Sequence, residues 1–186
     1  MNNWTAFTLI TLELQHTDYY ALLKSFAQQL NVALTDYVLQ LPAHIGKGYY
    51  KVVELPNGLQ VLLSDILYNT DVMYRRKKTD NYFCILYFTD VELSEPMQFV
   101  RNGKQHIDKS ARRSGISLVS SINDMSFTYN EKTKARCIEL LLPEHWINTN
   151  LNKYDELHLL MRFNQQQNSI VSVSYTHLRA HETGRN

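Results

Sequence analysis

The chain has 186 residues, of which 44% are hydrophobic and 20% are charged, and its formal net charge is +1. This length accommodates one domain with a hydrophobic core, and the composition is average for a soluble globular protein. The small net charge excludes a strong electric field that would attract nucleic acid or a membrane surface. Tyrosine is enriched, with 12 residues against 7 Phe and 2 Trp, which suits a β-rich domain with a polar-lined cavity.

The N-terminal part of the sequence predicts a short extension followed by a helix. Residues 1–14 have no basic lead and no unbroken apolar stretch. They fit neither a signal peptide nor a membrane span, so we expect a cytoplasmic protein without a membrane partner. Residues 18–30 have apolar side chains at helical spacing, with Thr17 or Asp18 available as the N-cap and Asn31 near the end. This pattern predicts an amphipathic helix.

Strands are predicted from residue 37 onward, where the spacing of apolar residues changes from that of a helix. The expected strands are short and are bounded by turn residues: 37–41, 49–55, 59–68, 71–76, 82–88, 98–101, 116–122 and 135–142. Pro56, Asn57 and Gly58 predict a tight hairpin between two of them, because proline presets φ and glycine supplies a positive φ. Regularly spaced short strands favour a sandwich or a small barrel.

The register of the strand over residues 82–88 stays open. Both of its faces are apolar, so periodicity does not decide which one faces the interior. The competing faces are Tyr82, Cys84, Leu86 and Phe88 against Phe83, Ile85 and Tyr87. The two cysteines, Cys84 and Cys137, lie in apolar runs and not in a close-spaced ligand pattern, so we expect reduced core residues.

After a turn at residues 142–146, helical spacing returns over residues 154–163. Tyr154, Leu157 and Met161 form a stripe on this segment that resembles the a and d positions of a coiled coil, which predicts a dimerisation helix. The alternative is that the stripe covers its own subunit, because the segment is shorter than two heptads. Residues 164–169 are rich in Gln and Asn, as is typical of a linker.

Three segments carry a family resemblance: LQLPAHIGKGY over residues 39–49, LPNGLQV over 55–61 and RRKKTD over 75–80. They resemble the N-terminal halves of a bacterial branch of AraC-type transcription regulators, and the resemblance spans about residues 30–163. It implies a mainly β, cupin-like jelly-roll barrel that binds a small-molecule effector, beside a helical pair that mediates homodimerisation. DNA would be a partner only through a C-terminal domain with two helix-turn-helix units, for which nothing after Phe163 is long enough.

The end of the sequence carries a second resemblance. Residues 173–183 read VSYTHLRAHET and resemble the translation of a transposase adapter used in sequencing libraries. The resemblance implies that residues 173–186 are not natural protein and that the natural chain continues beyond about Val171. His177 and His181 have the spacing of a helical metal-binding pair, but such an origin would leave them without a function.

The expected division of the chain follows from both resemblances. It has an N-terminal extension (1–16), a cupin-like sensor domain (17–143), a helical dimerisation or linker segment (144–163), the start of a linker (164–171) and an adapter-derived tail (172–186).

The sequence shows no arrangement of residues that is typical of catalysis. Metal-dependent cupin enzymes hold their ion with a His-x-His pair, and none is present here. A Gly-x-Ser-x-Gly elbow is also missing. We therefore expect no metal, no cofactor and no enzyme activity. The four consecutive cations at residues 75–78 favour a solvated or edge-protecting face over a phosphate-binding patch.

Tyr68, Tyr87 and Glu139 are the candidate ligand-binding residues. Each is a polar group inside an apolar run, so each either bonds an effector in the barrel or faces water. The expected function is that of an effector-sensing and dimerisation domain of an AraC-family regulator without its DNA-binding domain. The alternative is a free-standing cupin or jelly-roll protein, either a small-molecule enzyme or a carbohydrate-binding module.

Overall fold

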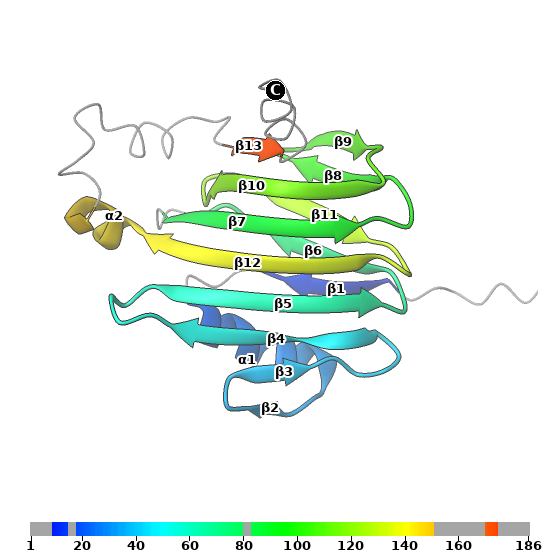
Figure 1. Ribbon diagram of the computed structural model, residues 1–186, viewed down its shortest axis with the longest axis horizontal. Helices are drawn as coiled ribbons and strands as arrows, with labels where there is room; N and C mark the ends of the chain where they lie inside the picture. The colour runs from blue at the N-terminus through cyan, green and yellow to red at the C-terminus, as the bar shows by residue number, and fades with distance from the viewer. Residues whose placement is uncertain (1–8, 15–17, 80–82, 151–169, 175–186) are drawn as a thin grey trace, which may run out of the picture.

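The computed structural model describes residues 9–14, 18–79, 83–150 and 170–174, and most of these residues form strands in two facing sheets (Figure 1). The eight-stranded sheet consists, in spatial order, of β13 (Ile170–Ser174), β10 (Arg112–Ser120), β7 (Phe83–Glu92), β12 (Lys134–Pro143), β5 (Gln60–Tyr68), β4 (Gly46–Glu54), β3 (Val38–Gln40) and β2 (Leu34–Thr35). The five-stranded sheet consists of β1 (Ile10–Glu13), β6 (Val72–Arg76), β11 (Met125–Tyr129), β8 (Met97–Arg101) and β9 (Lys104–Asp108).

The pairing of the strands from β5 to β12 is nested. The first pairs with the last, β5 with β12, and inside this pair lie β6 with β11, β7 with β10 and β8 with β9, all antiparallel. One long hairpin is thus rolled up so that its strands are divided between the two sheets, and this order of strands is that of a jelly roll. The predicted mainly β, cupin-like jelly-roll fold is confirmed.

The predicted first helix is confirmed as α1 (Tyr19–Leu30). The Asp18 side chain accepts a hydrogen bond from the Ala21 N–H at 3.0 Å, and Asn31 ends the helix in the left-handed region at φ 51°. Both are preferred cap residues for these positions. The helix lies between β1 and β4 (Figure 1) and contacts both of them. Its apolar face therefore closes the barrel where the five-stranded sheet ends.

The predicted hairpin between β4 and β5 is also confirmed. The Leu55 N–H donates to the Leu59 carbonyl at 2.8 Å, and Gly58 has a φ of 79°. Further along the same pair, Gly48 has a φ of 126°, and a Cβ at this position would lie 1.9 Å from the Asp65 carbonyl oxygen. Only glycine permits this approach of the two strands.

Five short strands have no counterpart among the predicted ones: β1, β2, β9, β11 and β13. β1 pairs in parallel with β6, and its Leu12 is buried, so part of the expected N-terminal extension belongs to the barrel. β13 pairs with β10 across the boundary that the sequence predicts between linker and tail. These segments are two to five residues long, which is too short for a period of two to stand out.

The second helix, α2 (Glu144–Asn150), settles the open register of β7. Ile147 of α2 packs with Leu59, Cys84 and Leu142 in a small cluster outside the barrel, and Leu86 lies against it. The opposite face of β7, with Phe83, Ile85 and Tyr87, points into the barrel. Both faces are apolar because one lines the barrel interior and α2 covers part of the other.

Two further expectations bear on the described residues. The helix α2 begins at Glu144, inside the predicted turn at 142–146 and at the start of the segment 144–163 that is expected to be helical. Cys84 and Cys137 are buried and form no disulfide, as predicted. No helix in the described part of the chain has the length and apolar character needed to cross a membrane.

Candidate ligand-binding cavity

The space between the two sheets contains a cavity of about 220 Å³. α1 and strands of both sheets contribute to its wall, which is mostly apolar and aromatic. Four charged side chains also line it: Arg76, Arg101, Arg113 and Glu139. A mainly apolar cavity with a few polar groups is the usual form of a small-molecule site.

All three candidate ligand-binding residues line this one cavity. Glu139 of β12 lies directly opposite Tyr87 of β7 in the register, so the two side chains are neighbours on the inner face of the eight-stranded sheet. Tyr68 ends β5 and is 2% exposed. The sequence alone leaves open whether these groups face water outside or the interior, and in the structure they line the interior cavity.

Among the described residues, Glu139 is the only acidic side chain in the cavity wall. Burial raises the pKa of its carboxyl to about 7, although the Arg76 charge and the Tyr19 hydroxyl lower it. Glu139 keeps part of its surface accessible, and that surface borders the cavity. Near neutral pH this carboxyl therefore exists in both protonation states, so that it either donates or accepts a hydrogen bond.

Arg76 corrects the expectation that residues 75–78 form a solvated face. Arg75 is half-exposed and lies 3.6 Å from the Glu13 carboxylate, but Arg76 is 3% exposed and lines the cavity. Side chains on β6 alternate between the two faces, with Val72, Tyr74 and Arg76 inside. Extending the period of two to the end of the strand predicted at 71–76 would have found this residue.

The guanidinium of Arg76 is only partly satisfied. Its Nη2 donates to the Ser120 carbonyl at 3.0 Å, whereas Nε and Nη1 are buried without an acceptor. The Tyr19 hydroxyl, on the α1 side of the cavity, is buried and interacts with Glu139, which lowers the pKa of that carboxyl. Buried polar groups normally have partners, so the Arg76 Nε and Nη1 at the cavity wall point to a missing ligand or water.

Three tyrosine hydroxyls from both sheets are joined at another part of the wall. The Tyr74 hydroxyl is hydrogen-bonded to that of Tyr50 and, at 2.7 Å, to that of Tyr68. Burial raises the pKa of all three phenols well above the ordinary value. They therefore stay neutral, able to donate and accept. No sequence pattern indicates this group of hydroxyls, because Tyr50 and Tyr74 belong to strands of different sheets.

The predicted dimerisation residues, Tyr154, Leu157 and Met161, lie outside the described residues. Within residues 9–14, 18–79, 83–150 and 170–174, no three His, Cys, Asp or Glu side chains come together as a metal site would require. The expectations of no metal and no cofactor stay predictions.

No protein-family model and no curated protein matches the sequence. Solved structures with similar folds include a cupin domain of Schizosaccharomyces pombe Cnp3, with 9% identity, a TM-score of 0.37 and coverage of 62% of this chain and 74% of that one. The Clostridium difficile EutQ protein has 14% identity, a TM-score of 0.33 and coverage of 62% and 83%. A predicted oxalate decarboxylase from Thermotoga maritima has 15% identity, a TM-score of 0.28 and coverage of 59% and 93%.

The fold class rests on the order of the strands, since every one of these TM-scores is below 0.5. The prediction that the chain is not an enzyme needs correction. A predicted oxalate decarboxylase is among the similar structures, so this kind of fold gives no ground for excluding catalysis. The missing His-x-His pair concerns only one kind of metal site.

Proposed function

We propose that the chain is the effector-sensing and dimerisation domain of an AraC-type regulator, and that its effector binds inside the jelly-roll barrel. The observation that carries the proposal is the cavity, which α1 and both sheets enclose and which Tyr68, Tyr87 and Glu139 of the eight-stranded sheet line. A ligand in contact with all of these elements would favour one arrangement of them over another, which is what an effector must do.

The regulator part of the proposal is supported by the resemblance of three segments to AraC-type proteins. In the structure, residues 39–49 connect β3 to β4, residues 55–61 form the hairpin into β5, and residues 75–80 include the end of β6. The first and third of these segments contribute to the core or the cavity through Leu39 and Arg76. A free-standing cupin protein would have the same fold, and it remains the second candidate.

Sequencing the gene beyond the codon for Gln165 separates the two candidates. The library for this experiment must be made without transposase adapters. The regulator proposal predicts that the gene continues past Val171 for about a hundred codons with two helix-turn-helix units, through which DNA would be bound. A stop codon soon after Val171 would contradict it and favour the free-standing protein.

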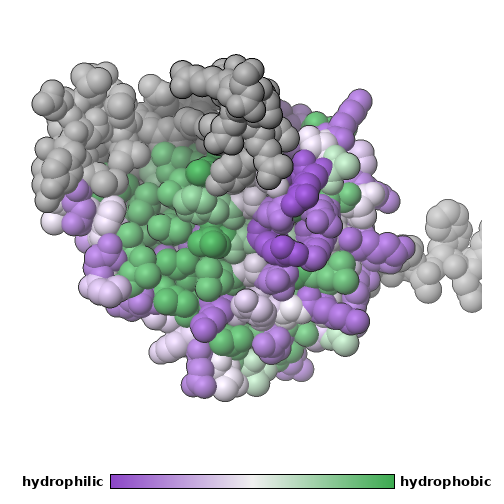
Figure 2. All heavy atoms as spheres, in the orientation of Figure 1, coloured by the Kyte–Doolittle hydropathy of each residue, from purple (hydrophilic) through white to green (hydrophobic). Residues whose placement is uncertain are grey.

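Dimerisation through Tyr154, Leu157 and Met161 stays part of the proposal, and a feature of the described residues supports a dimer. The outer face of the eight-stranded sheet carries two neighbouring rows of apolar side chains on β10, β7, β12 and β5. The rows consist of Ile116, Phe88, Ile138 and Leu63, and of Leu118, Leu86, Leu140 and Val61. Figure 2 shows hydrophobic surface gathered on this face, and Ile138 is 44% exposed.

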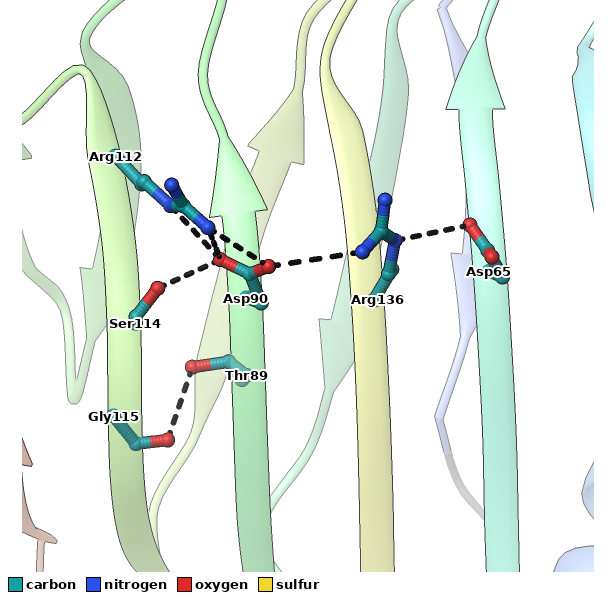
Figure 3. A network of polar contacts seen from close by, with 7 residues as sticks. All are labelled: Asp65, Thr89, Asp90, Arg112, Ser114, Gly115 and Arg136. Carbon is teal, nitrogen blue, oxygen red and sulfur yellow. Dashed lines mark hydrogen bonds and ion pairs between the residues drawn. The ribbon is translucent and has the colours of Figure 1, made fainter. Parts of the chain in front are cut away.

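A row of alternating charges borders these apolar rows (Figure 3). Arg136 lies 3.7 Å from Asp65 and 4.0 Å from Asp90, and the Arg112 Nε donates to Asp90 at 3.0 Å. From β5 to β10 the charges therefore alternate as acid, base, acid, base. Turned by a twofold axis, such a row places each acid against a base of its copy, as an isologous interface requires. The partner that fits this face is a second copy of the chain.

A further inference from the structure

We propose that the ligand of the barrel is an organic carboxylate with an apolar or aromatic body, and that Arg76 holds its carboxylate group. This inference rests on the interior site proposed above and adds the chemical class of its occupant. Its basis is a buried guanidinium with unused donors at a mainly apolar cavity.

Arg76 is buried with hydrogen-bond donors that have no acceptor. The side chain is 3% exposed, and only its Nη2 has an acceptor, the Ser120 carbonyl at 3.0 Å. Nε and Nη1 remain without one. An ionised group that is buried with unpaired donors is unfavourable, and an anionic acceptor in the cavity would satisfy it. The rigid fork of a guanidinium matches the two oxygens of a carboxylate.

The charged side chains that line the cavity are mostly basic. Among the charged side chains of the cavity wall, Arg76, Arg101 and Arg113 face a single acid, Glu139. Glu139 influences Arg76 electrostatically, but no ion pair within 4.0 Å joins these two described residues. Burial raises the pKa of Glu139 to about 7, so this carboxyl is partly neutral at neutral pH. The interior therefore keeps an excess of positive charge that suits an anion.

The side chains next to Arg76 in the cavity wall are apolar or aromatic. Met125 lies opposite Arg76 in the register of β11 and β6, and Phe127 of the same strand stacks on Tyr74 at 5.2 Å. All of these side chains line the cavity. An apolar body beside the carboxylate would bury its surface against them, whereas a free phosphate needs donors on every side.

The test compares benzoate with its neutral isostere benzamide, and both with inorganic phosphate, by NMR titration of the full chain at neutral pH. Benzoate is expected to bind at least about tenfold more tightly than benzamide, because only the anion forms charge-assisted hydrogen bonds. Arg76→Gln should reduce the affinity for benzoate to about that for benzamide. The matched control is Arg75→Gln, which removes the neighbouring exposed cation and should leave the affinity unchanged.

The outcomes separate this inference from the proposed function. Equal binding of benzoate and benzamide inside the barrel would overturn the carboxylate while leaving an interior ligand site. Tighter binding of phosphate than of benzoate would overturn the apolar body. Binding of neither aromatic compound would count against both the carboxylate and the interior site. The comparison of the compounds on the unmodified chain decides the matter even if Arg76→Gln fails to fold.

Discussion

At the scale of single residues, the interior of the barrel holds polar groups at a cost to stability. Glu139 is the clearest case, since folding raises the pKa of its carboxyl from 4.5 to about 7. Arg76 and the Tyr19 hydroxyl lower this pKa, but neither compensates fully for the burial of the carboxyl. Groups that oppose stability in this way are common at binding sites, because the site is completed by its ligand.

This pKa predicts how stability depends on pH. The folded chain binds the Glu139 proton more tightly than the unfolded chain, so the stabilisation is complete below about pH 4.5 and is lost as the pH rises through about 7. The loss amounts to at most about 3 kcal/mol. Urea unfolding at pH 5 and pH 8 should show a smaller decrease for Glu139→Gln than for the unmodified chain.

Glu95→Gln is the control for this measurement, because Glu95 is exposed on the turn before β8. It should show the same dependence on pH as the unmodified chain. Equal pH dependence of the unmodified chain and Glu139→Gln would show that the carboxyl does not titrate in this range.

At the scale of elements, hairpins and caps could be predicted from the sequence because their signals are local. Asp18, Asn31 and Gly58 each determine the backbone of their own turn, and the structure has each where the pattern predicted it. The boundaries of β10 and β12 differ from the predicted ones by a few residues, because pairing with β7 extends both of them.

What the sequence did not predict depends on contacts between distant segments. The register of β7 is set by α2 on one side and by the cavity on the other. Hydrogen bonds among the hydroxyls of Tyr50, Tyr68 and Tyr74 join β4, β5 and β6. Arg76 was missed because four consecutive cations were interpreted as one surface, although a strand directs alternate side chains to opposite faces.

Glycines in the β4–β5 hairpin give a prediction at this scale. Gly48→Ala should destabilise the chain by more than about 2 kcal/mol, because its Cβ would collide with the Asp65 carbonyl, at 1.9 Å, and its φ is positive. Gly58→Ala, where no atom lies within 4 Å of the new Cβ, should lose only about 1 kcal/mol from its positive φ. Thermal unfolding measures both variants, and equal losses would contradict the close approach of the two strands.

At the scale of the whole molecule, the two faces of the eight-stranded sheet have different proposed roles. The inner face borders the cavity, and the outer face carries the apolar rows and the alternating charges (Figures 2 and 3). Neighbouring residues on one strand belong to opposite faces, so a ligand inside the barrel lies one sheet away from the proposed dimer interface. This proximity gives the effector a direct route by which to influence association.

The dimer proposal predicts a change in molecular mass. Ile138→Lys places a charge in the middle of the apolar rows and should convert a dimer into a monomer, as measured by sedimentation equilibrium. Ile107→Lys on β9 is the matched control, because Ile107 is 56% exposed on the other sheet. It should leave the mass unchanged. A monomeric unmodified chain, or an Ile138→Lys variant that stays dimeric, would contradict this interface.

The central claim is that a small ligand occupies the interior of the barrel, and the most direct test is a crystal structure of the full chain grown with benzoate. We expect electron density for benzoate between the two sheets, with its carboxylate within hydrogen-bonding distance of Nε or Nη1 of Arg76. Density for benzoate only on the outer surface, or a barrel filled by its own side chains with no room for a ligand, would contradict it.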